Sequence, residues 1–308
     1  MSELVLDQVS RWFRNVVAVN DVSMRIGPGV TGLLGPNGAG KSTLINMMGG
    51  FLAPSTGHVT LDGVSVWGSV DAYRRIGIVP ERETMYDSMT GWQFVLANAK
   101  LHGLPDPTGA AKRAIATVDM ASAQDRDINT YSKGMRQRIK LATAIVHDPA
   151  VLLLDEPFNG MDPRQRAHLM EVLLQQGEEG RTVLFSSHIL EEVEQIASSI
   201  EVMVAGRHAA SGDFREIRLL MTQRPHEYVV RSSDDRQLAT AVIGEASTTG
   251  VTLVDGADGA TALHVRVVDL SAFSRALPRI AARDGIRLLE VTPADESLES
   301  VFSYLVAR

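Results

Sequence analysis

Apolar and polar residues follow two different patterns along the first two hundred residues. Residues 4–9 and 22–26 show the period of two that is typical of antiparallel strands with one buried face. Further on, short continuous apolar runs are separated by segments of helical spacing, which is typical of buried parallel strands. These runs lie at residues 30–34, 75–79, 151–154 and 182–186. Because such strands alternate with helices, the pattern predicts an α/β domain with a mainly parallel sheet.

Between residues 82 and 130 the strand pattern disappears and helical spacing takes over. Thr90 and Gln93 have the spacing of a capping box, which opens a helix that continues to about residue 101. A second helical stretch covers residues 108–120. The sequence therefore predicts a helical subdomain, at about residues 82–145, that is inserted into the α/β core.

A different order of elements begins after about residue 221. The segments with strand or helix patterns lie at residues 227–231, 237–243, 251–254, 262–267, 270–281 and 286–291. Their order, β-α-β-β-α-β, predicts a small α+β domain of the ferredoxin-like type, followed by a last helix at residues 297–306. We therefore expect two domains, at residues 1–221 and 222–308.

A glycine-rich loop between the strand at 30–34 and a helix at 41–48 carries the strongest chemical signal. It matches the pattern G-x-x-x-x-G-K-[ST] with Gly35, Pro36, Asn37, Gly38, Ala39, Gly40, Lys41, Ser42 and Thr43. Glycines let backbone N–H groups surround a phosphate, and the helix points its positive N-terminus at the same place. Lys41 is placed to reach the β- and γ-phosphate oxygens of ATP, and the Ser42 hydroxyl to bind Mg²⁺. A glycine turn without a ligand is the alternative, which the strand and helix on either side disfavour.

Two adjacent acids, Asp155 and Glu156, follow the apolar strand at 151–154. The carboxyl ends of parallel strands form the edge where open α/β sheets bind ligands. Neighbouring side chains of a strand diverge, so the two acids are suited to different work. We expect Asp155 to hold Mg²⁺ and Glu156 to take a proton from the attacking water. Alone, such a pair is more often a solvated turn, but the glycine loop reverses that preference.

A third motif, Tyr-Ser-Lys-Gly-Met-Arg-Gln-Arg at residues 131–138, lies shortly before the acidic strand. Here the sequence resembles the ABC ATPase family, whose signature LSGGQ sits in this place. Ser132 and Gly134 match the signature, whereas Lys133 and Met135 depart from it in a way similar to bacterial exporter ATPases. The resemblance implies that Ser132 and Gly134 cap the ATP of an opposite subunit, and a serine at a helix N-terminus suits a γ-phosphate. An ordinary N-cap role for Ser132 is compatible with this.

Other positions resemble the family in the expected order. Phe13 occupies the place of the aromatic residue that stacks on adenine, and its neighbour Trp12 is a weaker candidate. Asp162 matches the loop that crosses between subunits, and His188 the switch histidine, which implies a catalytic role beside Lys41 and Glu156. Glu81 stands where the family has a glutamine that touches magnesium, so Glu81 is a third candidate metal ligand.

The composition limits the remaining alternatives. The net charge of -7 disfavours a nucleic-acid partner, and the absence of cysteine fits a reducing cytoplasm. We read no secretion signal and no apolar run long enough to span a membrane, so action at a membrane requires a partner.

The resemblance implies an ATP-binding and ATP-hydrolysing subunit that powers an ABC exporter, with ATP and Mg²⁺ as cofactors. It would work at the cytoplasmic face of the membrane, paired with a second copy or a homologous subunit and coupled to a separate permease. We expect the permease to dock on residues 83–101, which include Met85, Tyr86, Met89 and Trp92. The alternatives are a soluble ABC ATPase that acts on DNA or ribosomes, a regulator whose C-terminal domain binds a metabolite, and an importer.

Overall fold

The central sheet of the first unit has the strand order β10-β9-β3-β8-β7-β6. The computed structural model describes residues 2–82, 85–213, 226–255 and 261–294. The strands of this sheet are β3 (Gly29–Leu34), β6 (Ile76–Val79), β7 (Val151–Leu154), β8 (Thr182–Ser187), β9 (Ser199–Val204) and β10 (Arg207–Gly212). Strands β6, β7, β8, β3 and β9 pair in parallel, while β10 is antiparallel to β9. The predicted mainly parallel sheet is confirmed.

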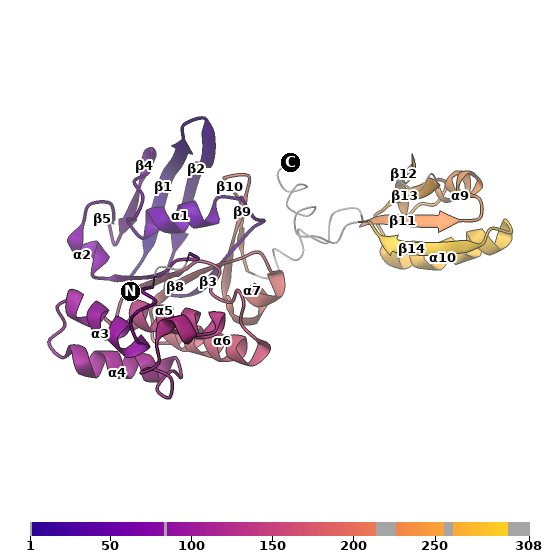
Figure 1. Cartoon of the computed structure of the whole chain (residues 1–308). Helices are drawn as coiled ribbons and strands as arrows, with labels where there is room; N and C mark the ends of the chain where they lie inside the picture. The colour runs from indigo at the N-terminus through magenta and orange to yellow at the C-terminus, as the bar shows by residue number, and fades with distance from the viewer. Residues whose placement is uncertain (1, 83–84, 214–225, 256–260, 295–308) are drawn as a thin grey trace. The chain divides into compact units, whose positions relative to one another are not determined.

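An antiparallel sheet with the order β2-β1-β4-β5 lies beside the central sheet (Figure 1). Its strands are β1 (Leu4–Phe13), β2 (Val16–Ile26), β4 (Thr56–Leu61) and β5 (Val64–Ser65). Strands β1 and β2 run longer than predicted, because their shared end exposes apolar residues such as Trp12 and Val16 and so breaks the alternation. One hydrophobic core joins this sheet, the first helix and the central sheet, through residues such as Leu6, Met47 and Leu153.

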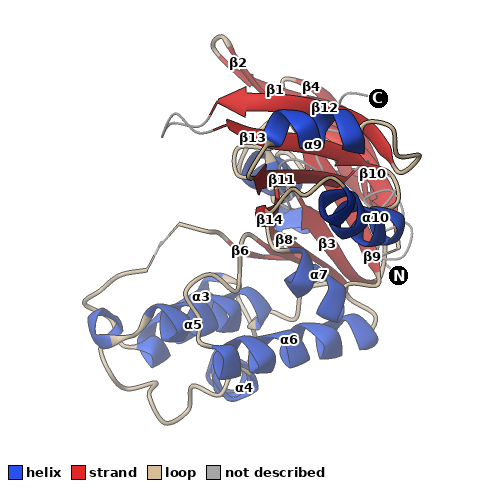
Figure 2. Cartoon of the chain, turned by 90° about the vertical axis from the view of Figure 1, so that its right-hand side faces the viewer, coloured by secondary structure: helices blue, strands red, loops and turns tan. Residues whose placement is uncertain are grey.

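Helices surround the central sheet. Their bounds are α1 (Lys41–Met48), α2 (Val70–Tyr73), α3 (Gly91–Leu101), α4 (Pro107–Thr117), a 3-10 turn η1 (Ile128–Thr130), α5 (Lys133–Ile145), α6 (Pro163–Glu178) and α7 (Leu190–Ile196). Figure 2 shows α3, α4 and α5 grouped to one side of the first unit's strands, in the segment where the sequence predicts an inserted helical subdomain. The capping box of Thr90 and Gln93 opens α3 as predicted. None of the helices in the described ranges is long and apolar enough to cross a membrane.

The second unit has its own sheet, with the strand order β12-β13-β11-β14 and antiparallel pairing throughout. The contacts divide the chain into the units Met1–Phe214 and Arg215–Arg308. The elements of the second unit are β11 (His226–Ser232), α9 (Asp235–Val242), β12 (Thr248–Asp255), β13 (Thr261–Val267), α10 (Leu270–Arg283) and β14 (Leu288–Pro293). The predicted element order is therefore present. The predicted last helix at 297–306 and the boundary at residue 221 lie outside the described residues.

Candidate functional site

The glycine-rich loop at residues 35–40 joins β3 to α1 and folds around the side chain of Lys41. Gly40 is the N-cap of α1 and has a φ of +97°, which side chains rarely adopt. A Cβ at Gly35 would meet the backbone oxygen of Met203, so the loop passes close to β9. Lys41 is only 6% exposed, and its Nζ donates to the carbonyl oxygens of Gly35 at 2.6 Å and Pro36 at 3.3 Å. The loop therefore holds a buried cation.

The other predicted residues of this loop surround that cation. Ala39 is buried, and its N–H donates to the Pro36 carbonyl oxygen at 3.1 Å, which closes the turn. Asn37 and Gly38 are exposed at the rim of the loop. Ser42 and Thr43 are half-buried in the first turn of α1. The free amides of a helix N-terminus and a nearby cation suit an anion such as a phosphate.

The acids at the end of β7 are more than nine-tenths buried, with Asp155 4% and Glu156 7% exposed. The Glu156 carboxylate bridges two other predicted catalytic residues. Its Oε1 lies 3.4 Å from Lys41 Nζ, and its Oε2 lies 3.0 Å from His188 Nδ1. These side chains come from the ends of different elements, which the parallel sheet brings to one edge.

Ser186 and Gln137 also contact this pair of acids, although the sequence did not single them out. The Ser186 hydroxyl donates to Asp155 Oδ1 at 2.7 Å and accepts from the Glu156 N–H at 2.8 Å. Gln137, on α5, donates through Nε2 to the backbone oxygens of Glu156 at 3.4 Å and Pro157 at 3.3 Å. The signal for Ser186 was available, since a hydroxyl at the end of a buried strand needs a polar partner. The contact of Gln137 depends on tertiary packing.

A third buried acid, Glu192 on α7, lies behind the histidine loop. Its Oε2 accepts from the Ser187 hydroxyl at 2.7 Å, and its Oε1 lies 3.4 Å from the Arg166 guanidinium on α6. Burial raises the pKa of Glu192, while these two partners act to lower it. Glu192 thus connects the segment before His188 to the helix that follows Asp162.

Ser132, Gly134 and Asp162 form a second group, at the N-termini of α5 and α6. Ser132 is the N-cap of α5 and accepts from the Met135 N–H at 3.2 Å. Asp162 is the N-cap of α6 and accepts from the Gln165 N–H at 2.9 Å. The Gln165 side chain also lies against Gly134, so the two helix starts are neighbours. Ser132 and Asp162 are exposed and available to a partner.

Two further candidates lie at the margins of the site. Phe13 ends β1 with 44% of its surface exposed, and the Arg11 guanidinium lies 4.7 Å from the centre of its ring. Glu81 is exposed and follows β6 closely. The end of β6 adjoins the first acid, because the Asp155 N–H donates to the Val79 carbonyl oxygen at 2.8 Å.

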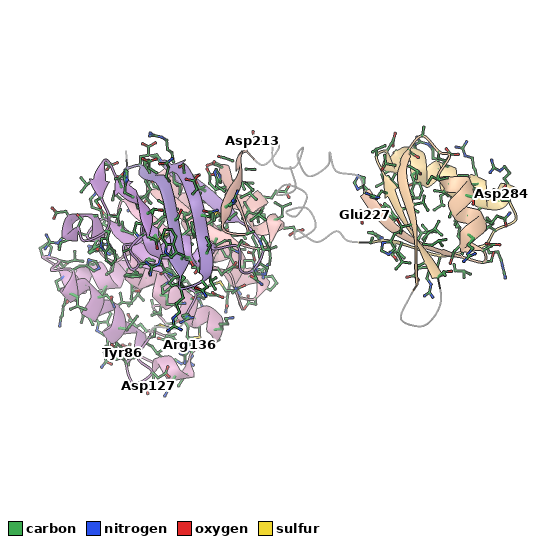
Figure 3. The ribbon with its side chains drawn as sticks, turned by 90° about the horizontal axis from the view of Figure 1, so that it is seen from above. Tyr86, Asp127, Arg136, Asp213, Glu227 and Asp284 are labelled. Carbon is green, nitrogen blue, oxygen red and sulfur yellow. The ribbon has the colours of Figure 1, made fainter. Side chains whose placement is uncertain are left out.

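The segment at 83–101, predicted to dock a permease, is exposed in part. Tyr86 is 69% exposed at the surface of the first unit (Figure 3), and its ring meets Phe94 edge-on. Met85, Met89 and Trp92 are half-buried.

A mainly apolar groove of about 330 Å³ lies next to this segment, between β6, α5 and the end of α3. His102 and His147 stack in it, with ring centres 3.8 Å apart. Residues from the end of α1 and from α2 complete its wall, among them Phe51 and Tyr73.

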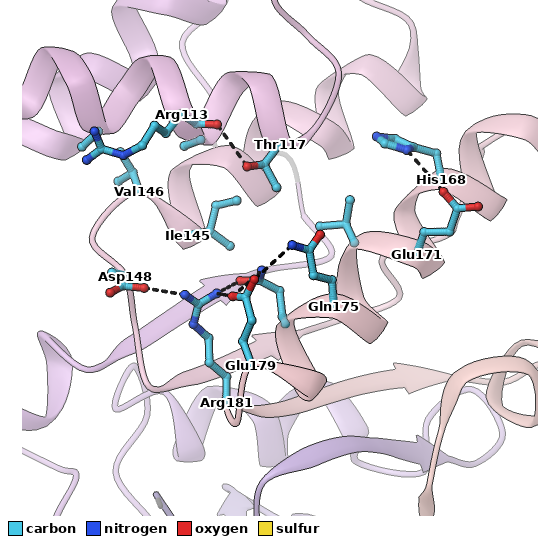
Figure 4. A pocket seen from close by; sticks show the side chains of 14 residues that line it. Arg113, Thr117, Ile145, Val146, Asp148, His168, Glu171, Gln175, Glu179 and Arg181 are labelled. Atoms are coloured by element: carbon cyan, nitrogen blue, oxygen red, sulfur yellow. Dashed lines mark hydrogen bonds and ion pairs between the residues drawn. The ribbon is translucent and has the colours of Figure 1, made fainter.

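A polar hollow of about 520 Å³ lies between α4, α6 and the end of α5 (Figure 4). Arg181 crosses it, paired with Asp148 and Glu179. None of the residues predicted to bind ATP lines this hollow.

The fold and the Lys41–Glu156–His188 contacts define a P-loop nucleotide hydrolase. Residues 19–159 match the family model described as ABC transporter. The chain is 31% identical to the bacitracin transport ATP-binding protein BcrA of Enterococcus faecalis, over 97% of this chain and 95% of that protein. It is 32% identical to the daunorubicin/doxorubicin resistance ATP-binding protein DrrA of Streptomyces peucetius, over 94% and 88%. The chain belongs to the family of ABC transporter ATP-binding proteins.

Solved structures agree with this assignment. One, described as the ATP binding subunit of an ABC transporter, is 26% identical with a TM-score of 0.64, over 70% of this chain and 92% of that one. The dimeric structure of a bacterial ABC transporter cassette also has a TM-score of 0.64, over 69% and 99%, and its 21% identity shows the fold alone. The prediction of an ATP-binding and ATP-hydrolysing exporter subunit is confirmed.

Proposed function

We propose that two such ATPase subunits close around two ATP molecules, each held by the glycine loop of one chain and capped by Ser132 and Gly134 of the other. The observation that carries this proposal is the separation of the site into two groups. Glu156 contacts both Lys41 and His188 within the chain, whereas the proposed cap lies at the N-terminus of α5, where Ser132 is exposed and Gly134 is buried. An exposed serine and free amides at a helix N-terminus suit the γ-phosphate held by a partner.

Within each site, residues 35–43 hold the phosphates and Phe13 stacks on adenine. The half-exposed ring of Phe13 supports this role, because a stacking residue must offer one face to its ligand. Asp162, at the start of α6, would contact the nucleotide or the partner across the dimer.

The donors near Lys41 fit Mg²⁺, which prefers oxygen ligands. Ser42 offers a hydroxyl in the first turn of α1, and Asp155 a carboxylate whose Oδ1 is held by Ser186. Glu81 is the third candidate, at the end of the neighbouring strand. When bound, the ion would neutralise charge on the β- and γ-phosphates.

For hydrolysis, Glu156 takes a proton from the attacking water, and His188 orients the water or the γ-phosphate. The 3.0 Å contact between His188 Nδ1 and Glu156 Oε2 supports this pairing, because it orients the carboxylate. Lys41 stabilises charge on the transferred phosphate.

A separate permease completes the exporter and holds the chain at the cytoplasmic face of the membrane. The apolar groove beside residues 83–101 supports a docking site in the groove itself, since a helix from a permease can bury apolar side chains in it. One named relative is a bacitracin transport protein and the other a daunorubicin/doxorubicin resistance protein, so an antibiotic-type cargo is the class to test first.

The second unit, which corresponds to the predicted domain at 222–308, would support dimer contacts or regulation. The order β12-β13-β11-β14, with α9 and α10 as crossovers, supports a ferredoxin-like fold for it.

Substituting Glu156→Gln tests the mechanism, because glutamine keeps the shape but cannot accept the proton. Phosphate release should fall by about 10²–10⁴, and the variant should elute as an ATP-bound dimer in size-exclusion chromatography with Mg²⁺ and ATP. Adding Ser132→Asp should keep the helix cap yet abolish the dimer, since its charge would face the partner's γ-phosphate. Near-normal phosphate release from Glu156→Gln would place the base elsewhere, and a dimer that survives Ser132→Asp would contradict the cap.

A further inference from the structure

We propose that Ser186 is a positioning residue, whose single hydroxyl sets both acids of the site. This rests on the roles proposed above for Asp155 and Glu156. Ser186 is fully buried near the end of β8, the strand that pairs with β7. Leu154 pairs with Phe185, so Ser186 lies at the level at which the two acids begin.

The direction of each hydrogen bond follows from the chemistry of the groups. A hydroxyl has one proton to donate and lone pairs to accept with. The Glu156 N–H can only donate, so Ser186 accepts from it at 2.8 Å. The Ser186 proton is then free for Asp155 Oδ1, at 2.7 Å.

This hydroxyl fixes a backbone conformation that Glu156 would otherwise avoid. Glu156 has a φ of +49°, in the left-handed region that residues with a Cβ rarely adopt. The Ser186 bond anchors its N–H independently of the side chain, whose oxygens face Lys41 and His188. The backbone can therefore stay in place while the carboxylate changes partners.

The same hydroxyl sets which oxygen of Asp155 is available. Because Oδ1 accepts from Ser186, the carboxylate is held in one orientation and Oδ2 is left to meet a metal ion. Loss of the hydroxyl should therefore weaken the contribution of Mg²⁺ to ATP binding, and it should also slow turnover.

The neighbouring serine provides a matched control. Ser187 is equally buried on the same strand, but its hydroxyl donates to Glu192 and makes no described hydrogen bond to Asp155 or Glu156. If the effect came from a general disturbance of β8, Ser186→Ala and Ser187→Ala would both cause it. If Ser186 positions the acids, only Ser186→Ala should cause it.

The test measures the affinity of the full chain for a fluorescent ATP analogue, with Mg²⁺ or with EDTA, together with phosphate release. Ser186→Ala should leave the affinity in EDTA within about twofold of wild type and reduce the tightening by Mg²⁺ about tenfold. Its turnover should fall about 10- to 100-fold. Ser187→Ala should keep the wild-type tightening by Mg²⁺.

A second pair of variants separates the hydroxyl from the space it fills. Ser186→Thr keeps the hydroxyl and should restore both the tightening by Mg²⁺ and the turnover. Ser186→Val places a side chain of the same size as threonine but without the hydroxyl, and it should restore neither. This pair decides the matter even if Ser186→Ala folds poorly, because strain is common to both variants. Equal behaviour of Thr and Val, or a wild-type response to Mg²⁺ in Ser186→Ala, would overturn the role of Ser186. If instead Asp155→Asn and Glu156→Gln behave as wild type, the proposed function itself fails.

Discussion

The ion pair between Lys41 and Glu156 allows a quantitative test of how the site is held together. We consider the variants Lys41→Met and Glu156→Gln, and the double variant that carries both. Glu156→Gln keeps the length of the side chain, Lys41→Met shortens it by one heavy atom, and each removes the charge. Lys41 and Glu156 are more than nine-tenths buried. Removing one partner therefore leaves the other as a buried charge without its counterion.

The distance of 3.4 Å between Lys41 Nζ and Glu156 Oε1 sets the size of the expected loss of unfolding free energy. With an effective dielectric of about 20, two charges at this distance attract by about 5 kcal/mol before desolvation is subtracted. Breaking a buried pair from one side typically costs about 3–5 kcal/mol. The double variant has neither charge, so its loss of unfolding free energy should be smaller than the sum of the single losses by about 2 kcal/mol or more.

Urea unfolding, followed by tryptophan fluorescence, measures these free energies. The chain has three tryptophans, Trp12, Trp67 and Trp92, and all of them lie in the first unit, which contains the site. The signal therefore reports the unfolding of that unit. Independent sites are additive within about 0.3–0.5 kcal/mol, so additivity of the two losses within this range would refute the pairing.

Three further predictions concern other parts of the chain. Phe51 lines the groove and is 63% exposed, so Phe51→Glu should abolish co-purification with the permease and keep basal ATPase activity. Tyr86→Glu should still co-purify with the permease. The reverse result would place the docking site on the exposed part of the 83–101 segment. Burial and the neighbouring His102 lower the pKa of His147 from 6.5 to about 4. The unfolded chain therefore binds more protons between these pH values, and the free energy of unfolding falls as the pH drops through that window. In urea titrations between pH 7.5 and 5, His147→Gln should show a smaller fall in the free energy of unfolding than the wild type, and an equal fall would contradict this reasoning. A chain that ends at Asp213 should still bind ATP with its wild-type affinity in a nucleotide titration. A truncated chain that folds but does not bind ATP would show that the second unit contributes to the site.

Local sequence patterns were sufficient for the glycine loop and for the strand β7, which ends just before Asp155. The spacing of Gly35, Gly40 and Lys41 predicts the loop, and the bond from Lys41 to Gly35 lies within the motif, although the loop also packs against β9. The capping box at Thr90 is local in the same sense. Where a signal is contained within a few residues, the sequence predicts the structure well.

Contacts between distant segments were harder to predict. Glu156 meets His188 across 32 positions of sequence, and Ser186 reaches Asp155 across 31. Such contacts depend on the order of strands in the sheet, which periodicity does not determine. The extension of β1 to Phe13 was missed for another reason, since its exposed apolar end has no alternating pattern.

The contacts of Glu156 also suggest how the proposed mechanism keeps the base inactive until substrate is present. Lys41 is the cation proposed to hold the γ-phosphate, yet its Nζ lies 3.4 Å from Glu156 Oε1. Phosphate oxygens that draw Lys41 away would free this oxygen of Glu156 to accept a proton from water, while His188 still holds the other oxygen. The Ser186 bond to the Glu156 N–H would keep the backbone of Glu156 in place during this exchange. Binding of ATP and activation of the base would thus be one event, because both depend on the same lysine.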